Sequence, residues 1–129
     1  MHSDDGTYSG SNFEKWMNIY LSLAPTAGLK FITDTELVSL AKAAGFVDVS
    51  VTTWKQPQGP WAKDKKMKEL GKISTAITET AFDSHGLALF TQFGGMDAEE
   101  AKRLGRLAHE DVVGRKVHAY NRRKYIVSA

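Results

Sequence analysis

The chain contains two segments with the pattern of a β-strand, and a long helical stretch separates them. In the first, Val47, Val49 and Val51 alternate with polar residues, which predicts a half-buried strand that runs to about Trp54. The second segment, Val117 to Val127, is rich in β-branched and aromatic residues and predicts the last strand. Because two strands alone make a poor sheet, we expect an open strand edge and an uncovered apolar face.

Helical periodicity with clear start signals fills most of the remaining chain. Ser11 and Thr33 each precede a Glu by three residues, the pattern of a capping box, and Asp97 begins a third helix in the same way. A fourth helix is expected from about Lys63 to Ala81, and a short apolar helix over residues 87 to 93. The apolar stripes expected to face the core are Leu37, Leu40, Ala41 and Ala44 in the second helix, and Met67, Leu70, Ile73, Ile77 and Ala81 in the long one.

Length and composition indicate one small globular domain. The 129 residues are 42% hydrophobic with a net charge of +2, values that favour neither nucleic acid nor an acidic membrane as a partner. The absence of cysteine excludes disulfides and thiolate metal sites and fits a cytoplasmic protein. Residues 1–10 are polar and rich in Gly and Ser, so we expect a flexible lead-in to a single domain over residues 11–129. The basic runs Lys63 to Lys68 and Arg122 to Lys124 lack interleaved aromatic residues, so we expect solvated faces.

Four short motifs carry a family resemblance. Residues 43–49, Ala-Ala-Gly-Phe-Val-Asp-Val, are similar to the entry into the sixth strand of many methyltransferases. The turn Gly-Pro-Trp at 59–61, with Lys-Asp at 63–64, resembles the fungal secondary-metabolism type. Val-His-Ala-Tyr at 117–120 resembles the seventh strand of that group, and Asp-Asp-Gly-Thr at 4–7 a segment just after its fifth strand. The chain therefore resembles the C-terminal part of fungal methyltransferases that use S-adenosylmethionine.

This resemblance implies the C-terminal part of a Rossmann-like α/β fold, or an α+β-like fragment of it. The two strands would pair antiparallel, and residues 63–113 or so would form a helical lid. The glycine-rich loop and the acidic ribose contact of the family have no counterpart in these residues, so no cofactor is expected for the isolated chain. Gln56, Gln58 and the basic run after Tyr120 depart from the family pattern and weaken any transfer of substrate contacts.

Candidate site residues come from the last strand and from two tryptophans. His118 and Tyr120 lie two positions apart, so on a strand they share a face, where either could act as a general acid or base. A packed strand face with satisfied polar groups is the alternative. Trp61 and Trp16 could line an aromatic substrate pocket or belong to the core. The four histidines are scattered without metal-ligand spacing, so no metal site is expected.

Three functions follow as hypotheses. In the first, the chain is a truncated methyltransferase-like protein that cannot bind S-adenosylmethionine by itself and acts as a partner or survives as a relic. In the second, it is a cofactor-independent cyclase or isomerase for a polyketide-like or terpenoid-like substrate, a hydrophobic small molecule. In the third, it is one half of a split methyltransferase. A homodimer or a partner chain is expected to cover the open sheet edge.

Overall fold

The structure, a computed structural model, describes residues 1 to 128. The predicted order of helix, helix, strand, helices, strand is confirmed, and the class is mixed α/β. The elements are α1 (Asn12–Leu23), η1 (Ala24–Ala27), α2 (Asp34–Ala43), β1 (Ser50–Gln58), α3 (Lys65–Thr80), η2 (Ala81–Gly86), α4 (Leu87–Gln92), α5 (Ala98–Val113) and β2 (Ala119–Val127).

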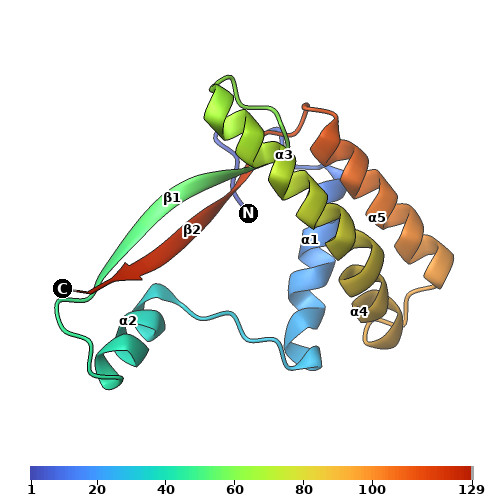
Figure 1. Ribbon diagram of the computed structural model, residues 1–129. Coiled ribbons are helices and arrows are strands. Elements are labelled where there is room, and N and C mark those ends of the chain that lie inside the picture. The colour runs from blue at the N-terminus through green and yellow to red at the C-terminus, as the bar shows by residue number, and fades with distance from the viewer. Residues whose placement is uncertain (129) are drawn as a thin grey trace.

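The molecule consists of a helical body and a projecting pair of antiparallel strands, β1 and β2 (Figure 1). We call this pair the hairpin, although α3, η2, α4 and α5 lie between its strands in the sequence. Helices α1, α3, α4 and α5 pack together on one side, and the paired strands extend away from them with α2 near their far end. The core lies in the helical body, where aromatic side chains of α1 meet those of η2 and α4. Its buried members are Phe13, Trp16, Phe82, Leu89, Phe90, Ala101, Leu104, Ala108, Val112, Val117 and Ala119.

The hairpin is the two-stranded antiparallel pair that the family resemblance implies. Its register runs from Ser50 opposite Val127 to Gln58 opposite Ala119. The first strand begins later than predicted, because Asp48 has a φ of 50° that interrupts the extended backbone. It also ends later, at Gln58, since its pairing with β2 continues to Ala119. Pro57 lies within the strand, as it can on an edge strand that needs no N–H donor at that position.

The apolar stripe predicted for α3 is wrong at two of its five positions, while Met67, Leu70 and Ala81 are half-buried. Ile73 and Ile77 are exposed, and the buried positions of this helix are instead Gly71 and Ser74. A Cβ on Gly71 would lie 2.0 Å from the backbone oxygen of Gly59, so only glycine lets α3 approach the turn after β1 this closely. Polar contacts complete the interface, because the amide of Gln56 donates to the Ser74 hydroxyl at 2.7 Å. Small and polar residues therefore pack α3 on the hairpin.

The α2 stripe is also largely outside the core. Only Ala41 is buried in this helix, and Leu40 is exposed. The predicted capping box at Thr33 is complete, since its hydroxyl accepts from the Glu36 N–H and its own N–H donates to the Glu36 carboxylate. An ion pair between Lys124 and Asp34 links the start of α2 to β2. This helix is thus well formed but loosely packed.

The two apolar helices predicted before Gly94 are one continuous helical path. Helix α3 passes into α4 through η2, a π-helical turn. Gly86 ends that turn beside the indole of Trp16, and a Cβ there would lie 2.3 Å from the Trp16 ring. The packing of Trp16 therefore requires glycine at this position, and the widened turn makes room for the ring.

Large apolar side chains are exposed on the far half of the hairpin and around it, which agrees with the expected uncovered face. Trp54, Tyr125 and Val127 are exposed on the strands themselves. Further exposed residues in the linker before α2 and in the loop after it are Leu29, Phe31, Ile32, Phe46 and Val47. Within residues 1–128, none of the helices is both long and apolar enough to span a membrane.

Candidate functional site

The N-terminal segment lies against the start of β2 and differs from the flexible lead-in that its composition predicts. The backbones of His2 and Tyr120 exchange hydrogen bonds of 3.0 and 2.9 Å in an antiparallel bridge. The His2 ring stacks on the Tyr120 ring with centroids 5.7 Å apart. This contact places Asp4, Asp5 and Thr7 beside the two residues that the sequence nominates for catalysis.

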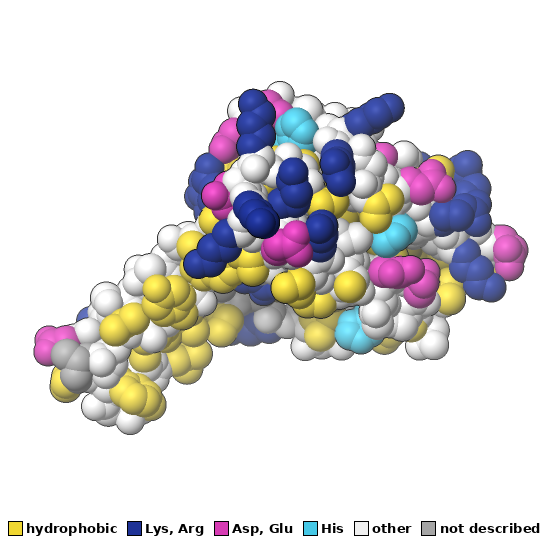
Figure 2. Space-filling view, turned by 45° about the horizontal axis from the view of Figure 1, so that its top comes forward, with side chains coloured by type: hydrophobic (Ala, Val, Ile, Leu, Met, Phe, Trp, Pro, Cys, Tyr) yellow, Lys and Arg dark blue, Asp and Glu magenta, His cyan; other side chains and the backbone are white. Residues whose placement is uncertain are grey.

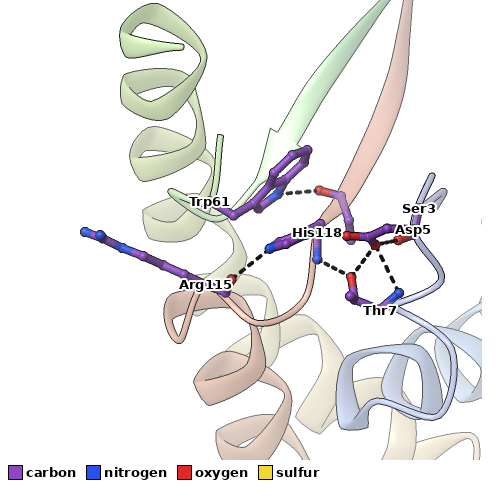
Figure 3. Close-up of polar contacts among 7 residues, drawn as sticks. Ser3, Asp5, Thr7, Trp61, Arg115 and His118 are labelled. Atoms are coloured by element: carbon purple, nitrogen blue, oxygen red, sulfur yellow. Dashed lines mark hydrogen bonds and ion pairs between the residues drawn. The ribbon is translucent and has the colours of Figure 1, made fainter. Parts of the chain in front are cut away.

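Asp5 is the acceptor at the centre of this cluster (Figure 3). Its carboxylate accepts from the hydroxyl of Thr7 at 2.7 Å and from the Thr7 N–H at 3.1 Å. The Ser3 hydroxyl donates to the same oxygen at 3.0 Å, and the second oxygen lies 2.5 Å from Nδ1 of His118. The Thr7 hydroxyl in turn accepts from the His118 N–H at 2.8 Å. Asp5 and Thr7 therefore fix both the backbone and the ring of His118.

The His118 ring is held from three directions. While Nδ1 faces Asp5, Nε2 lies 3.0 Å from the carbonyl oxygen of Arg115. The Trp61 ring packs against it in a tilted arrangement with centroids 5.1 Å apart, and the Trp61 indole donates to the carbonyl of Ala119 at 3.0 Å. Because both ring nitrogens face acceptor oxygens, neither can take a proton from a substrate until one contact opens.

Tyr120 has a similar set of partners on the same strand face. Its hydroxyl donates to Asp4 at 2.7 Å, and Lys55 lies 4.5 Å above its ring centroid. Lys55 also forms an ion pair of 2.6 Å with Asp4. The side chain of Tyr120 is buried, so its hydroxyl can meet a substrate only if the N-terminal segment moves.

The hydrogen bonds of this cluster determine its electrostatics. The Thr7 hydroxyl, followed by His118, holds the pKa of Asp5 well below its usual range. Hydrogen bonds from Lys55 and then from Tyr120 lower the pKa of Asp4, and the bond to Asp4 raises the pKa of Lys55. Both carboxylates are therefore anions. Asp4 holds donors from β1 and β2, and Asp5 holds the N-terminal segment to His118, just before β2.

We predict that the docking of the N-terminal segment depends on the charge of Asp5. The pKa of Asp5 is lowered in the folded state, so the stabilisation that its carboxylate gives to docking is complete above the usual pKa of an aspartate. That stabilisation is lost as the pH falls through the lower pKa of the folded state. Asp5→Asn should remove most of it at neutral pH. The Tyr120 N–H, which bonds to His2, should then exchange with solvent faster.

Amide exchange of Tyr120 measures this, with Asp83→Asn as the matched control. Asp83 is exposed on η2, so its substitution should leave the Tyr120 N–H as protected as in the native chain. Equal protection in both variants would show that Asp5 does not hold the segment.

Trp16, the fourth nominated residue, lies in the helical core away from this cluster. It stacks on Tyr20 with centroids 5.1 Å apart. Tyr20 lines an open, mostly apolar groove of about 230 Å³. The groove lies between the end of α1 and the start of α4, and its other lining residues are Ala27, Leu29, His85, Ala88, Leu89 and Phe93. The structure thus brings His118, Tyr120 and Trp61 together and sets Trp16 behind a separate groove.

Sequence reasoning missed the acidic half of the cluster. The composition of residues 1–10 predicts a flexible segment, and only the resemblance of Asp4, Asp5 and Thr7 to a family motif indicates a role for them. Lys55 belongs to no recognised motif. It meets Asp4 because β1, which carries Lys55, pairs with β2, against which the N-terminal segment lies. Within the part of the chain that the structure describes, no group of histidine and acidic side chains could hold a metal ion.

Comparisons with known proteins give fungal homologues. The chain is 28% identical over 125 residues to the methyltransferase cpsF of Aspergillus campestris, which covers 94% of this chain and 43% of that protein. It is 25% identical over 120 residues to the methyltransferase pytC of Aspergillus terreus, covering 92% of this chain and 37% of pytC. A 29% match over 87 residues to the secondary metabolism regulator laeA of Monascus pilosus covers 67% of this chain and 23% of laeA. The resemblance to fungal secondary-metabolism methyltransferases is confirmed, at low identity.

These matches cover only part of the related proteins. The chain spans less than half the length of the curated relatives it matches. No family model matches the chain. No solved structure matches it either.

Proposed function

We propose that these residues form the substrate-side part of a methyltransferase-like protein of fungal secondary metabolism. This part does not bind S-adenosylmethionine by itself and works with a partner that covers its hairpin. The family is supported by the homologues, which match nearly the whole chain over less than half of their own length. In the family that the chain resembles, a glycine-rich loop and an acidic residue hold the cofactor, and neither occurs among these residues.

The uncovered hairpin is the observation that carries the proposal. Trp54, Tyr125 and Val127 expose apolar surface on two strands whose only further strand pairing within residues 1–128 is the isolated bridge between His2 and Tyr120. Contiguous apolar surface and an unpaired strand edge on a small domain mark an interaction site. A second copy of the chain is the simplest cover, because a two-fold axis lets the same edge serve both partners.

We predict that the chain alone does not bind S-adenosylmethionine with useful affinity. A helix N-terminus preceded by a glycine-rich turn and a strand is what such a ligand requires of the backbone. Gly94 and Gly95 lie between two helices instead. Titration calorimetry of the native chain with the cofactor should give no saturable heat. A dissociation constant in the micromolar range would contradict the proposal.

A split methyltransferase predicts a different calorimetric result. If a second chain supplies the cofactor loop, binding of S-adenosylmethionine should begin only when that chain is added. Turnover of a substrate by the lone chain would instead support a cofactor-independent cyclase or isomerase.

The groove beside Tyr20 is the specific observation that favours this second candidate. Its aromatic and aliphatic walls suit a polyketide-like or terpenoid-like molecule, with His85 as the polar group at its side. A substrate could also meet His118 and Tyr120 if residues 1–10 swing away. Asp5 would leave the imidazole with that segment, and the released Nδ1 could move a proton while Nε2 stays on the carbonyl oxygen of Arg115.

The two locations are separable by substitution. Ala88→Phe would fill the groove, whereas Tyr120→Phe would remove only the hydroxyl that bonds to Asp4. Loss of turnover in one variant and not in the other would locate the chemistry.

A further inference from the structure

A basic surface lies at the end of the molecule where α3 begins and α5 ends. Figure 2, in which the top of Figure 1 comes forward, shows many Lys and Arg side chains gathered on this face, with acidic ones beside them. The turn before α3 and the loop after α5 are in contact, because the Trp61 ring packs against His118 and Nε2 of His118 lies 3.0 Å from the carbonyl oxygen of Arg115. The basic surface consists of Lys63, Lys65, Lys66, Lys68, Arg115 and Lys116.

None of these six side chains has an internal counter-charge. Within residues 1–128, the lysine ion pairs involve Lys30, Lys55, Lys72, Lys102 and Lys124, all outside the basic surface. Of the two carboxylates in residues 63–69, Asp64 is the N-cap of α3 and accepts from the Met67 N–H, and Glu69 pairs with Lys72. The positive charge of this surface is therefore uncompensated by the chain itself.

Three of the lysines also oppose the dipole of their own helix. Lys65, Lys66 and Lys68 are in the first turns of α3, which carries no acidic residue there. Helices α1, α2 and α5 all have acidic first turns. Positive charge at a helix N-terminus destabilises the helix, so this arrangement costs stability without an internal gain. Such a conflict is expected where surface residues are retained for binding.

We propose that this basic surface docks an acidic protein segment, rich in Asp and Glu. The inference goes beyond the proposed function, because it concerns a surface apart from the hairpin edge and the groove. An acidic segment fits this surface better than nucleic acid does, since five of the six side chains are lysines and the neighbouring Trp61 ring already packs against His118. A membrane surface is disfavoured because Val113 is the only exposed large apolar side chain within residues 59–70 and 110–118, too little to insert into a bilayer.

Binding of fluorescent poly-L-glutamate to the native chain, followed by anisotropy, tests the proposal. Binding should weaken as salt is added. Lys65→Glu with Lys66→Glu should reduce the affinity by a factor of about ten or more. The same double variant should raise the melting temperature by roughly 3 to 6 °C, because acidic residues complement the helix N-terminus. A gain in stability together with a loss of binding is a result that a purely structural role would not give.

The matched control is Lys15→Glu with Lys42→Glu. These lysines are also exposed and form no ion pair within the described residues, and the change in net charge is the same. The control should retain binding. Equal loss in both double variants would show a response to net charge alone and overturn the proposal. Absence of binding to poly-L-glutamate, or equal or tighter binding to a duplex oligonucleotide or to phosphatidylserine vesicles, would overturn it as well.

Discussion

Trp16→Ala should destabilise the protein by on the order of 3 to 5 kcal/mol, the range for removing a large buried aromatic side chain. Only 3% of Trp16 is exposed, and its ring contacts Tyr20, Phe82 and Phe90. It joins α1 to η2 and α4, so its loss would leave a cavity between elements far apart in the sequence. Chemical denaturation at fixed protein concentration measures the change in the free energy of unfolding.

Two further tryptophan variants make this prediction specific. Trp54→Ala removes the same side chain at a position that is 37% exposed on the hairpin, and it should cost about 1 kcal/mol or less. Trp16→Phe keeps an aromatic ring and removes an indole N–H that has no hydrogen-bond partner, so its cost should be smaller than that of Trp16→Ala. Similar costs for Trp16→Ala and Trp54→Ala would place the core elsewhere.

Gly59→Ala should destabilise the protein by about 2 to 5 kcal/mol, from two separate causes. The φ of Gly59 is 104°, which is strained for any residue with a Cβ. That Cβ would also lie 2.3 Å from the backbone oxygen of Val112 at the end of α5, and an overpacked contact adds a cost of its own. Backbone atoms cannot rotate away, so the turn that carries Trp61 must shift.

Gly45→Ala separates these causes. Its φ is 95°, but a Cβ would meet nothing within 4 Å, so we expect only the conformational cost of about 1 to 2 kcal/mol. Equal costs at Gly45 and Gly59, measured by the same denaturation, would contradict the close approach of the turn to α5.

Local signals in the sequence predict the elements well. The hydroxyl of Ser11 caps α1 and Asp97 caps α5 as their patterns indicate. At α1 the Glu14 carboxylate accepts from the Gly10 N–H, one residue before the cap. These features depend on residues close in sequence, so a local pattern contains the information that they require.

Packing directions were harder to predict because they depend on distant partners. The periodicity of Ile73 and Ile77 gives an amphipathic helix, but Gly71 decides which face approaches the hairpin. For the same reason, a polar N-terminal segment gives no local sign that Asp5 meets His118 across the whole length of the chain. His118 lies one residue before β2 and Tyr120 lies within it, and the N-terminal partners of both, Asp5 and Asp4, are visible only in the fold.

Sedimentation of the native chain over a range of concentrations tests the central claim, that the hairpin is a surface in need of a cover. The exposed Trp54, Tyr125 and Val127 predict that the average mass rises with concentration toward that of a dimer. Tyr125→Glu, which places a charge on this surface, should shift the equilibrium back toward the monomer. A native chain that stays monomeric at the highest concentration would contradict the account.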